Sequence, residues 1–191
     1  MPAAAVAAAA RPQSIVPSWI VYGFQFVAIG AWTAYAVVYF EAMGIDIAVI
    51  GVLAAVPAIV AILASPAWGL VADRLGDMRL PYLVAAIWAA LAAVGLAMAP
   101  GMPWLAVAVL MLSVGAAGLT PLIDARTIQR LWPQRERFGQ ARVAGSFAFM
   151  AGTIGTGILV AASDLRTMFV VYAVAMTGAG IAAVALLGRP R

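Results

Sequence analysis

The chain is dominated by six apolar stretches, each long enough to cross the hydrocarbon core of a bilayer as an α-helix. Only 9% of its residues are charged, whereas an ordinary soluble domain has about 25%. The connectors are too short for a separate soluble domain, so we predict an all-α membrane protein with one six-helix bundle over residues 17–188. The predicted spans lie near residues 18–40, 47–72, 81–99, 104–128, 141–163 and 168–187.

The basic residues are divided unevenly between the two sets of connectors. Of the eleven arginines, only Arg166 falls in the connectors on one side, and the other ten fall in the opposite connectors or the tails. Cytoplasmic connectors carry an excess of basic residues, so the tails at residues 1–16 and 189–191 are predicted to be cytoplasmic. This topology explains the net charge of +4 without a nucleic-acid partner. We expect a multi-pass protein of the plasma (inner) membrane, surrounded by the lipid bilayer.

The inventory of reactive side chains argues against an enzyme. The chain has no cysteine and no histidine, which excludes disulfides, thiolate and imidazole chemistry and the commonest zinc sites. It has no G-x-S-x-G motif, and Asp124 is the one acidic residue clearly at membrane depth. We therefore expect no catalytic residues, no cofactor and no metal.

Asp124 and Arg142 form the most informative pair of charges. Each lies nine residues from Pro133, in the connector between the fourth and fifth spans. In an antiparallel helical hairpin, positions equidistant from the turn lie at the same depth, so the carboxylate and the guanidinium can face each other. A charge at membrane depth costs about 2.5–3.5 kcal/mol and usually belongs to a solute pathway. Purely structural pairing is the alternative.

Polar stripes on two helices are expected to line one aqueous cavity. The fifth span places five side chains within about 40° of one line, namely Arg142, Ser146, Phe149, Thr153 and Thr156. The first span has polar or aromatic residues every seven positions, at Ser18, Gln25, Trp32 and Tyr39, with Tyr22 nearby. The alternative is that these groups only join helices by hydrogen bonds, each contributing about 0.6 kcal/mol.

Other residues predict how the helices begin, bend and pack. Asp46 is expected to cap the second span. Pro57 and Pro66 in that span and Pro121 in the fourth are expected to interrupt and bend their helices. A ribbon of small residues predicts a close helix contact for the fifth span, at Ala141, Gly145, Ala148, Gly152 and Gly155. Tryptophans are expected at the headgroup level near span ends, at Trp19, Trp68, Trp104 and Trp132.

The segment W-G-L-V-A-D-R-L-G-D-M-R, residues 68–79, lies between the second and third spans. It resembles the signature of the major facilitator superfamily, G-x-x-x-D-R-x-G-R-R/K. The matching residues are Gly69, Asp73, Arg74 and Gly76. Asp77 stands where that family has a basic residue, and we interpret Arg79 as its partial replacement.

The segment R-F-G-Q-A-R-V-A-G-S-F-A-F, residues 137–149, resembles the start of the fifth helix in the lactose permease and nucleoside symporter-like group, where F-G-x-A-R-x-x-G occurs. The matching residues are Phe138, Gly139, Ala141, Arg142 and Gly145. In the lactose permease, an acidic residue eighteen positions before this arginine also contacts the sugar. Asp124 has that offset, although the permease has Glu, and Trp32 replaces Tyr in a first-helix G-A-Y stretch.

The resemblance implies one six-helix half of a twelve-helix transporter that works by alternating access. Asp124, Arg142, Trp32, Gln25, Ser146 and Phe149 are then the candidate substrate-binding residues. Asp73 would help govern the conformational switch through the other half, and a solvated pair with Arg74 or Arg79 is the alternative. Proton coupling is implied by the resemblance alone.

We therefore expect transport of a small polar organic solute: a sugar, a nucleoside or an aromatic acid. The partner would be a second six-helix half, from the same gene, a split gene or a second copy. A homodimeric half-transporter and a non-transporting membrane scaffold are the alternatives.

Overall fold

The structure, a computed structural model, describes residues 14–132 and 134–188, and every regular element in them is a helix. Residues 1–13 and 189–191, which hold most of the predicted tails, lie outside the described residues, as does Pro133. The elements are α2 (Val16–Ala42), α3 (Ile47–Leu75), α4 (Arg79–Ala97), α5 (Trp104–Ala116), α6 (Leu119–Leu131), the 3-10 turn η1 (Arg135–Arg137), α7 (Phe138–Ala162) and α8 (Thr167–Leu186).

Six segments of the described chain are long and apolar enough to cross a membrane. One of them, Trp104–Leu131, contains both α5 and α6, so the predicted six-span, all-α fold is confirmed. Helices extend slightly beyond the apolar runs, since Arg74 lies in the last turn of α3 and Arg79 begins α4. Asp46 caps α3 as predicted, because its Oδ1 accepts the N–H of Ala48 at 2.8 Å.

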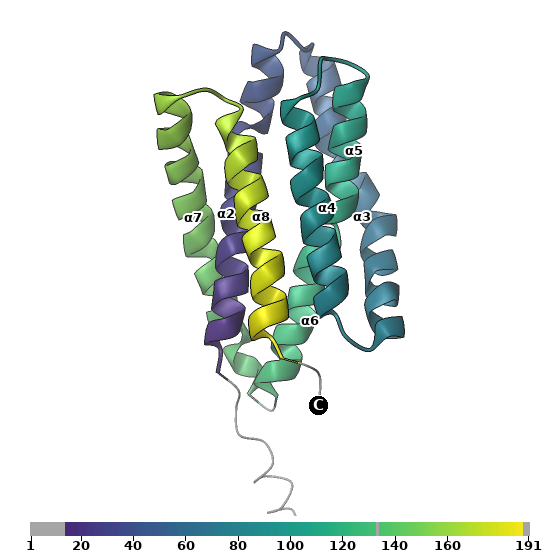
Figure 1. Cartoon of the computed structure of the whole chain (residues 1–191), viewed down its shortest axis with the longest axis vertical. Coiled ribbons are helices and arrows are strands. Elements are labelled where there is room, and N and C mark those ends of the chain that lie inside the picture. The colour runs from purple at the N-terminus through teal and green to yellow at the C-terminus, as the bar shows by residue number, and fades with distance from the viewer. Residues whose placement is uncertain (1–13, 133, 189–191) are drawn as a thin grey trace, which may run out of the picture.

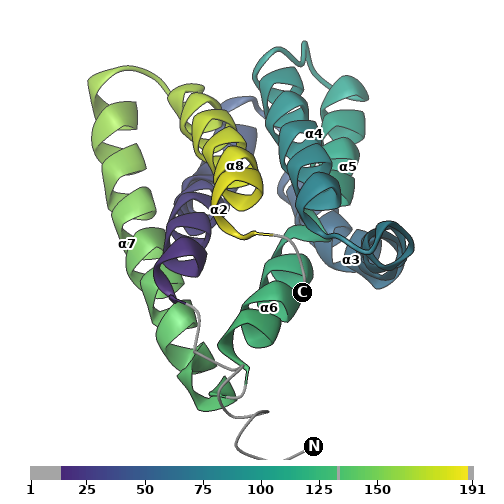
Figure 2. The same cartoon turned by 60° about the horizontal axis from the view of Figure 1, so that its bottom comes forward.

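The spans pack as one bundle with α2 and α8 near its middle (Figure 1). α2 packs on α7 and α8, α8 packs on α4, and α4 packs on α5, while α3 contacts mainly α5. α3 and α7 therefore lie on opposite flanks (Figure 2). Only 11% and 17% of their apolar windows are buried, against 39% to 44% in the other spans. Their exposed apolar side chains suit contact with lipid or with another apolar body.

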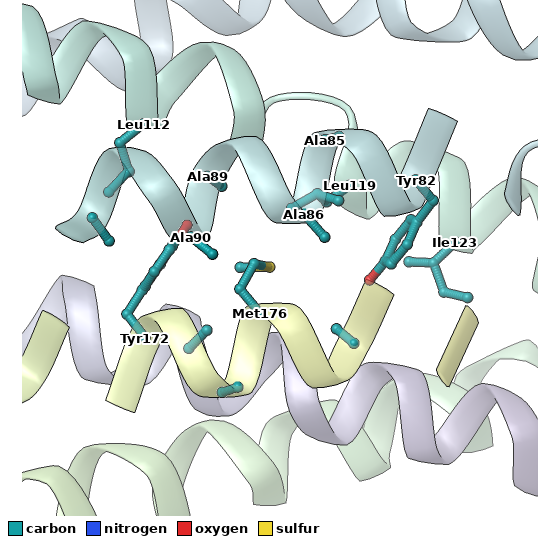
Figure 3. Close-up of a cluster of buried hydrophobic side chains, with 14 of the residues drawn as sticks. Tyr82, Ala85, Ala86, Ala89, Ala90, Leu112, Leu119, Ile123, Tyr172 and Met176 are labelled. Atoms are coloured by element: carbon teal, nitrogen blue, oxygen red, sulfur yellow. The ribbon is translucent and has the colours of Figure 1, made fainter. Parts of the chain in front are cut away.

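Small side chains let α4 and α8 approach each other closely in the core. Figure 3 shows Ala86 and Ala90 of α4 on the side that faces Met176 of α8. A Cβ added to Gly180 of α8 would lie 2.9 Å from Leu83 Cδ1 of α4, which leaves no room for a larger residue without movement. Between membrane helices such small residues allow van der Waals contact of the backbones, which is a main source of their association.

Glycines also bring α7 onto α2, as the small-residue ribbon predicts. A Cβ on Gly152 would lie 2.7 Å from Val27 Cα and O, and Gly145 is buried on the same side. Gly155 has no atom within 4 Å of its ideal Cβ position, so this member of the ribbon lies outside the contact. Thr156, expected in the polar stripe, is instead only 1% exposed. The polar stripe and the small-residue ribbon are centred about 100° apart around the axis of α7. The side of the stripe nearest the ribbon therefore faces α2 and is buried there.

The prolines within the spans differ in their effect. α3 continues through Pro57 and Pro66, so neither proline ends this helix, and the bend expected there stays a prediction. The fourth span does break, between Ala116 and Leu119, just before Pro121. Pro121 has no N–H to donate to the preceding turn, which favours a break at this point. Beyond it, α6 runs at a clear angle to α5 (Figure 2).

α3, α6 and α8 end, and α2, α4 and α7 begin, at the same end of the bundle (Figure 1). Most of the arginines in the described part of the chain lie in the helix ends and connectors on this side. Arg166 lies at the opposite end, just before α8. Arg126 and Arg130 were expected in a connector but belong to α6, because that helix extends to Leu131. The sided distribution is therefore a property of the fold, while the identity of the cytoplasmic side remains a prediction.

Three of the four tryptophans expected at the headgroup level are exposed near span ends, at Trp19, Trp104 and Trp132. Trp68 differs from this expectation. Its indole is partly buried, and Nε1 donates to the carbonyl oxygen of Val114 at 2.8 Å. Trp68 is thus part of a helix contact, because the break after α5 leaves space for its ring.

Candidate functional site

Asp124 of α6 and Arg142 of α7 contact each other directly. Arg142 Nη1 donates to Asp124 Oδ2 at 2.6 Å, the pairing expected for residues equidistant from a helical turn. The side chains of Asp124 and Arg142 are 24% and 41% exposed, so the pair lies on the surface of this bundle and is not sealed in its core. Exposed ion pairs contribute little to stability. A molecule that approaches this face can reach both charged groups.

Tyr22 of α2 holds the second oxygen of the carboxylate. Its hydroxyl donates to Asp124 Oδ1 at 2.5 Å, and the tyrosine is fully buried. The carboxylate is thus oriented by two helices, α2 and α7. Sequence reasoning noted Tyr22 near the stripe of the first span but did not join it to Asp124, because 102 positions separate the two residues.

Further hydrogen bonds on either side of this contact join α2 to α6. Thr127 donates to Ser18 at 3.0 Å, and Gln25 Nε2 donates to Thr120 Oγ1 at 2.7 Å. Tyr82 of α4 donates to Gln25 Oε1, also at 2.7 Å. Ser18 and Gln25 are each 1% exposed, so this part of the first-span stripe is packed and does not line an open cavity. We call the three contacts between the helices the α2–α6 ladder: Ser18–Thr127, Tyr22–Asp124 and Gln25–Thr120.

The face of α7 beyond Arg142 carries the next two predicted residues. Ser146 is exposed and Phe149 is half-buried, one and two turns after Arg142. On α2, the ring of Phe26 has its centroid 5.8 Å from Arg142 Cζ. Arg142 donates to Asp124 through Nη1, and the guanidinium has further N–H groups that can donate to a solute. Arg142, Ser146 and Phe149 thus present donors and an aromatic edge along one helix.

Trp32 lies in a different part of the bundle. It lines a cavity of about 460 Å³ between α2, α3, α5 and α8, together with Phe40 and Pro57, and neither member of the charged pair borders this cavity. Trp32 is ten residues from Tyr22 along α2, which corresponds to about 15 Å. The structure therefore brings Asp124 and Arg142 together but places Trp32 apart from them.

The signature residues border a second cavity, of about 400 Å³, which we call the signature cavity. Gly69 and Asp73 of α3 form one wall, and Pro121 and Ala125 of α6 form the other. Gly76 ends α3 with φ of 61°, a left-handed conformation that glycine adopts without steric cost. The exposed side chains of Asp73 and Arg74 lie at this end of α3.

Arg79 makes its ion pair with Asp77. Its Nη2 lies 2.7 Å from Asp77 Oδ2, and its Nε lies 2.9 Å from the same oxygen. These hydrogen bonds lower the pKa of Asp77 below its usual range. Among residues 14–132 and 134–188, ion pairs form only here and between Asp124 and Arg142, so neither involves Asp73.

Two arginines of α6 tie it to the end of α8. Arg126 Nη2 donates to the carbonyls of Leu187 and Gly188, at 3.1 and 2.7 Å, and Arg130 Nη1 donates to Leu187 at 2.6 Å. Cations are favourable at a helix C-terminus, where backbone carbonyls lack partners. Arg126 is only 5% exposed. The sequence did not predict these hydrogen bonds between α6 and the end of α8, because both arginines were expected in a connector.

A comparison with protein-family models identifies the family of the chain. The model of the MFS_1 like family matches residues 18–188 and so reaches into all six spans. The chain belongs to the MFS_1 like family. The predicted relationship to a six-helix half of a major facilitator transporter is thereby confirmed.

One curated relative of this MFS_1 like chain is the maltose permease of Geobacillus stearothermophilus. The two sequences are 28% identical over 183 residues, which cover 95% of the chain and 46% of the permease. The chain thus spans about half the length of that relative. No solved structure matches the chain. Membership in the MFS_1 like family and the six apolar helices point to a multi-pass membrane protein that serves transport, not to an enzyme.

Proposed function

We propose that the chain is the N-terminal half of a secondary transporter that moves a small polar organic solute by alternating access. The observation that supports this most is the Asp124–Arg142 pair, which joins two spans at 2.6 Å and remains partly exposed. A guanidinium offers a fork of donors, and a carboxylate offers acceptors. A solute with neighbouring hydroxyl groups can replace the contact within the pair by hydrogen bonds to both partners.

A sugar is the solute class that we favour. One relative whose match covers 95% of this chain is a maltose permease, and hydroxyl-rich rings suit a site with both donors and acceptors. Nucleosides and aromatic acids are the other classes that the same groups can bind. Ser146 and Phe149 would extend the contact with the solute along α7. Gln25 is buried and would act indirectly, through its hydrogen bond to Thr120 of α6. Trp32 would contact only the distal part of a long solute.

The second half and the coupling ion are further parts of this proposal. The relative is about twice as long as the chain, which supports a partner of similar size that closes the other side of the solute pathway. The signature residues Gly69, Asp73, Arg74, Gly76 and Arg79 would contribute to the conformational switch. Proton symport across the plasma membrane, with both termini cytoplasmic, is proposed from the family resemblance and the arginine distribution.

A parallel homodimer or a scaffold is the second candidate. The weak burial of α3 and α7 favours it, because two flanks of one bundle then remain available for another six-helix body. Reading the coding sequence beyond Arg191, and in the neighbouring genes, for six more apolar spans separates these possibilities.

The test is uptake by the purified protein, with its second half where one is found, in proteoliposomes. We expect uptake of radiolabelled maltose above that of empty liposomes, and a loss of that uptake in Asp124→Asn. Uptake of radiolabelled uridine and phenylacetate, compared with that of maltose, ranks the solute classes. Absence of uptake for maltose, uridine and phenylacetate alike would contradict transport and favour the scaffold.

A further inference from the structure

The fourth span contains a break that the other five spans lack in the described chain. α5 ends at Ala116, α6 begins at Leu119, and Pro121 removes one donor from the first turn of α6. Asp124 lies on α6, beyond the break. The angle between α5 and α6 therefore decides where this carboxylate lies relative to the rest of the bundle.

Trp68 of α3 occupies the break. Its Nε1 donates at 2.8 Å to the carbonyl oxygen of Val114, the acceptor that residue 118 would use in a continuous helix. Gly118 lies directly against the same side chain, since an added Cβ would be 2.5 Å from Trp68 Cβ and Cγ. The tryptophan thus satisfies a backbone group and fills the space beside Gly118.

The same helix that carries Trp68 also carries the signature residues. Gly69 follows Trp68 directly, and Asp73 lies about one and a half turns further on. Both residues line the signature cavity, whose opposite wall is α6 at Pro121 and Ala125. Trp68 therefore contacts the break between α5 and α6, while the signature end of the same helix faces α6 across the cavity.

We propose that Trp68 is a positioning residue that sets the angle between α5 and α6 and thereby the place of Asp124 relative to Arg142. The α2–α6 ladder fixes α6 along its length, and Trp68 contacts Gly118, the residue that directly precedes α6, and Val114 of α5. A displacement of the signature end of α3 is passed through Trp68 to Asp124. The effect on transport rests on the proposed function, whereas the effect on the angle does not.

The direct test is a distance measurement that needs no solute. The chain has no cysteine, so nitroxide labels attach only at the introduced pair Val107→Cys on α5 and Ala125→Cys on α6. A change of about 20° in the bend, the size of a sharp helix kink, moves Ala125 by about 4 Å. The distance between Val107 and Ala125 changes by about half of this, because part of the movement is perpendicular to the line that joins them. In the purified protein in nanodiscs, we expect Trp68→Phe to shift or broaden the distance distribution by about 2 Å, because it keeps a ring but loses the donor.

Trp88→Phe is the matched control. The Trp88 indole of α4 also donates to a carbonyl of α5, that of Met111 at 2.9 Å, but away from the break. We expect it to leave the distances unchanged. A wild-type distribution in Trp68→Phe, or an equal shift in Trp88→Phe, would overturn the proposal. Gly118→Ala is a second variant that pushes on the ring from the other side and should shift the distances as well.

Maltose uptake supplies the functional readout. A site that is displaced by an ångström or more loses its solute, so Trp68→Phe should raise the half-saturating maltose concentration about tenfold, and Trp88→Phe should not. An unchanged half-saturating concentration alongside shifted distances would overturn the link to Asp124. If the wild type takes up no maltose, the substrate assignment fails, and the distances alone decide the role of Trp68.

Discussion

The hydroxyl of Tyr22 donates a 2.5 Å hydrogen bond to Oδ1 of Asp124, from the first span to the fourth. This bond leaves Oδ2 for Arg142 and fixes the direction in which the carboxylate presents its acceptors. A solute that takes over the contact to Arg142 would therefore find the carboxylate already oriented. Such preorganisation lowers the ordering that binding would otherwise require.

Replacement of Tyr22 by Phe is predicted to weaken solute binding with little change in packing. A hydrogen bond to a charged group contributes about 1.5–3 kcal/mol, so the affinity should fall tenfold or more. Half-saturation of maltose uptake measures the effect. Tyr35→Phe is the control, since it removes a 2.9 Å bond to the carbonyl of Thr153 and leaves Asp124 untouched. Equal losses in the two variants would argue against a specific role for Tyr22.

Replacement of Gly152 by Ala is predicted to destabilise the contact between α2 and α7. The new methyl group would lie 2.7 Å from backbone atoms of Val27, which cannot rotate away, and overpacking of this kind costs about 1–3 kcal/mol. Gly155→Ala is the matched control on the same helix, with open space at its Cβ position, and should be neutral or slightly stabilising. Thermal unfolding in detergent compares the variants. An unfolding temperature for Gly152→Ala at or above that of Gly155→Ala would contradict the close contact.

The Asp77–Arg79 pair predicts an acid-dependent part of the stability. The hydrogen bonds from Arg79 lower the pKa of Asp77, so the folded protein binds this proton less readily than the unfolded chain does. The stabilisation is therefore complete above the ordinary carboxyl pKa of about 4 and is lost as the pH falls through the lowered value. Unfolding temperatures measured from neutral to acidic pH should decline less steeply in Asp77→Asn. Parallel curves for the variant and the wild type would count against the pair.

Much of the fold follows from the sequence because lipid imposes a simple rule. Each span must be about twenty apolar residues with its backbone satisfied internally, so hydropathy alone places six helices. The break in the fourth span does not follow from this rule. Pro57 and Pro66 predict an interruption as much as Pro121 does, but α3 continues as a helix through both of them. What distinguishes the fourth span is Gly118, which admits the ring of Trp68 from another helix.

The contact between Asp124 and Arg142 could be predicted from the sequence, whereas the residues that surround this pair could not. The contact of Asp124 with Arg142 depends on a hairpin between consecutive helices, which sequence spacing describes. Tyr22 approaches from a span that is distant in sequence, and Trp32 turns toward a separate cavity although it shares the seven-residue spacing of Gln25. Spacing along one helix gives the side a residue occupies but not the neighbour that covers it.

The most direct measurement is solute uptake by Arg142→Lys in proteoliposomes, beside the wild type and Asp124→Asn. Lysine keeps the charge but lacks the planar fork of donors, so the account predicts that maltose uptake falls at least about tenfold in Arg142→Lys while the protein still folds. It predicts a comparable loss in Asp124→Asn. Wild-type uptake in both variants would contradict the assignment of this pair as the solute-binding site.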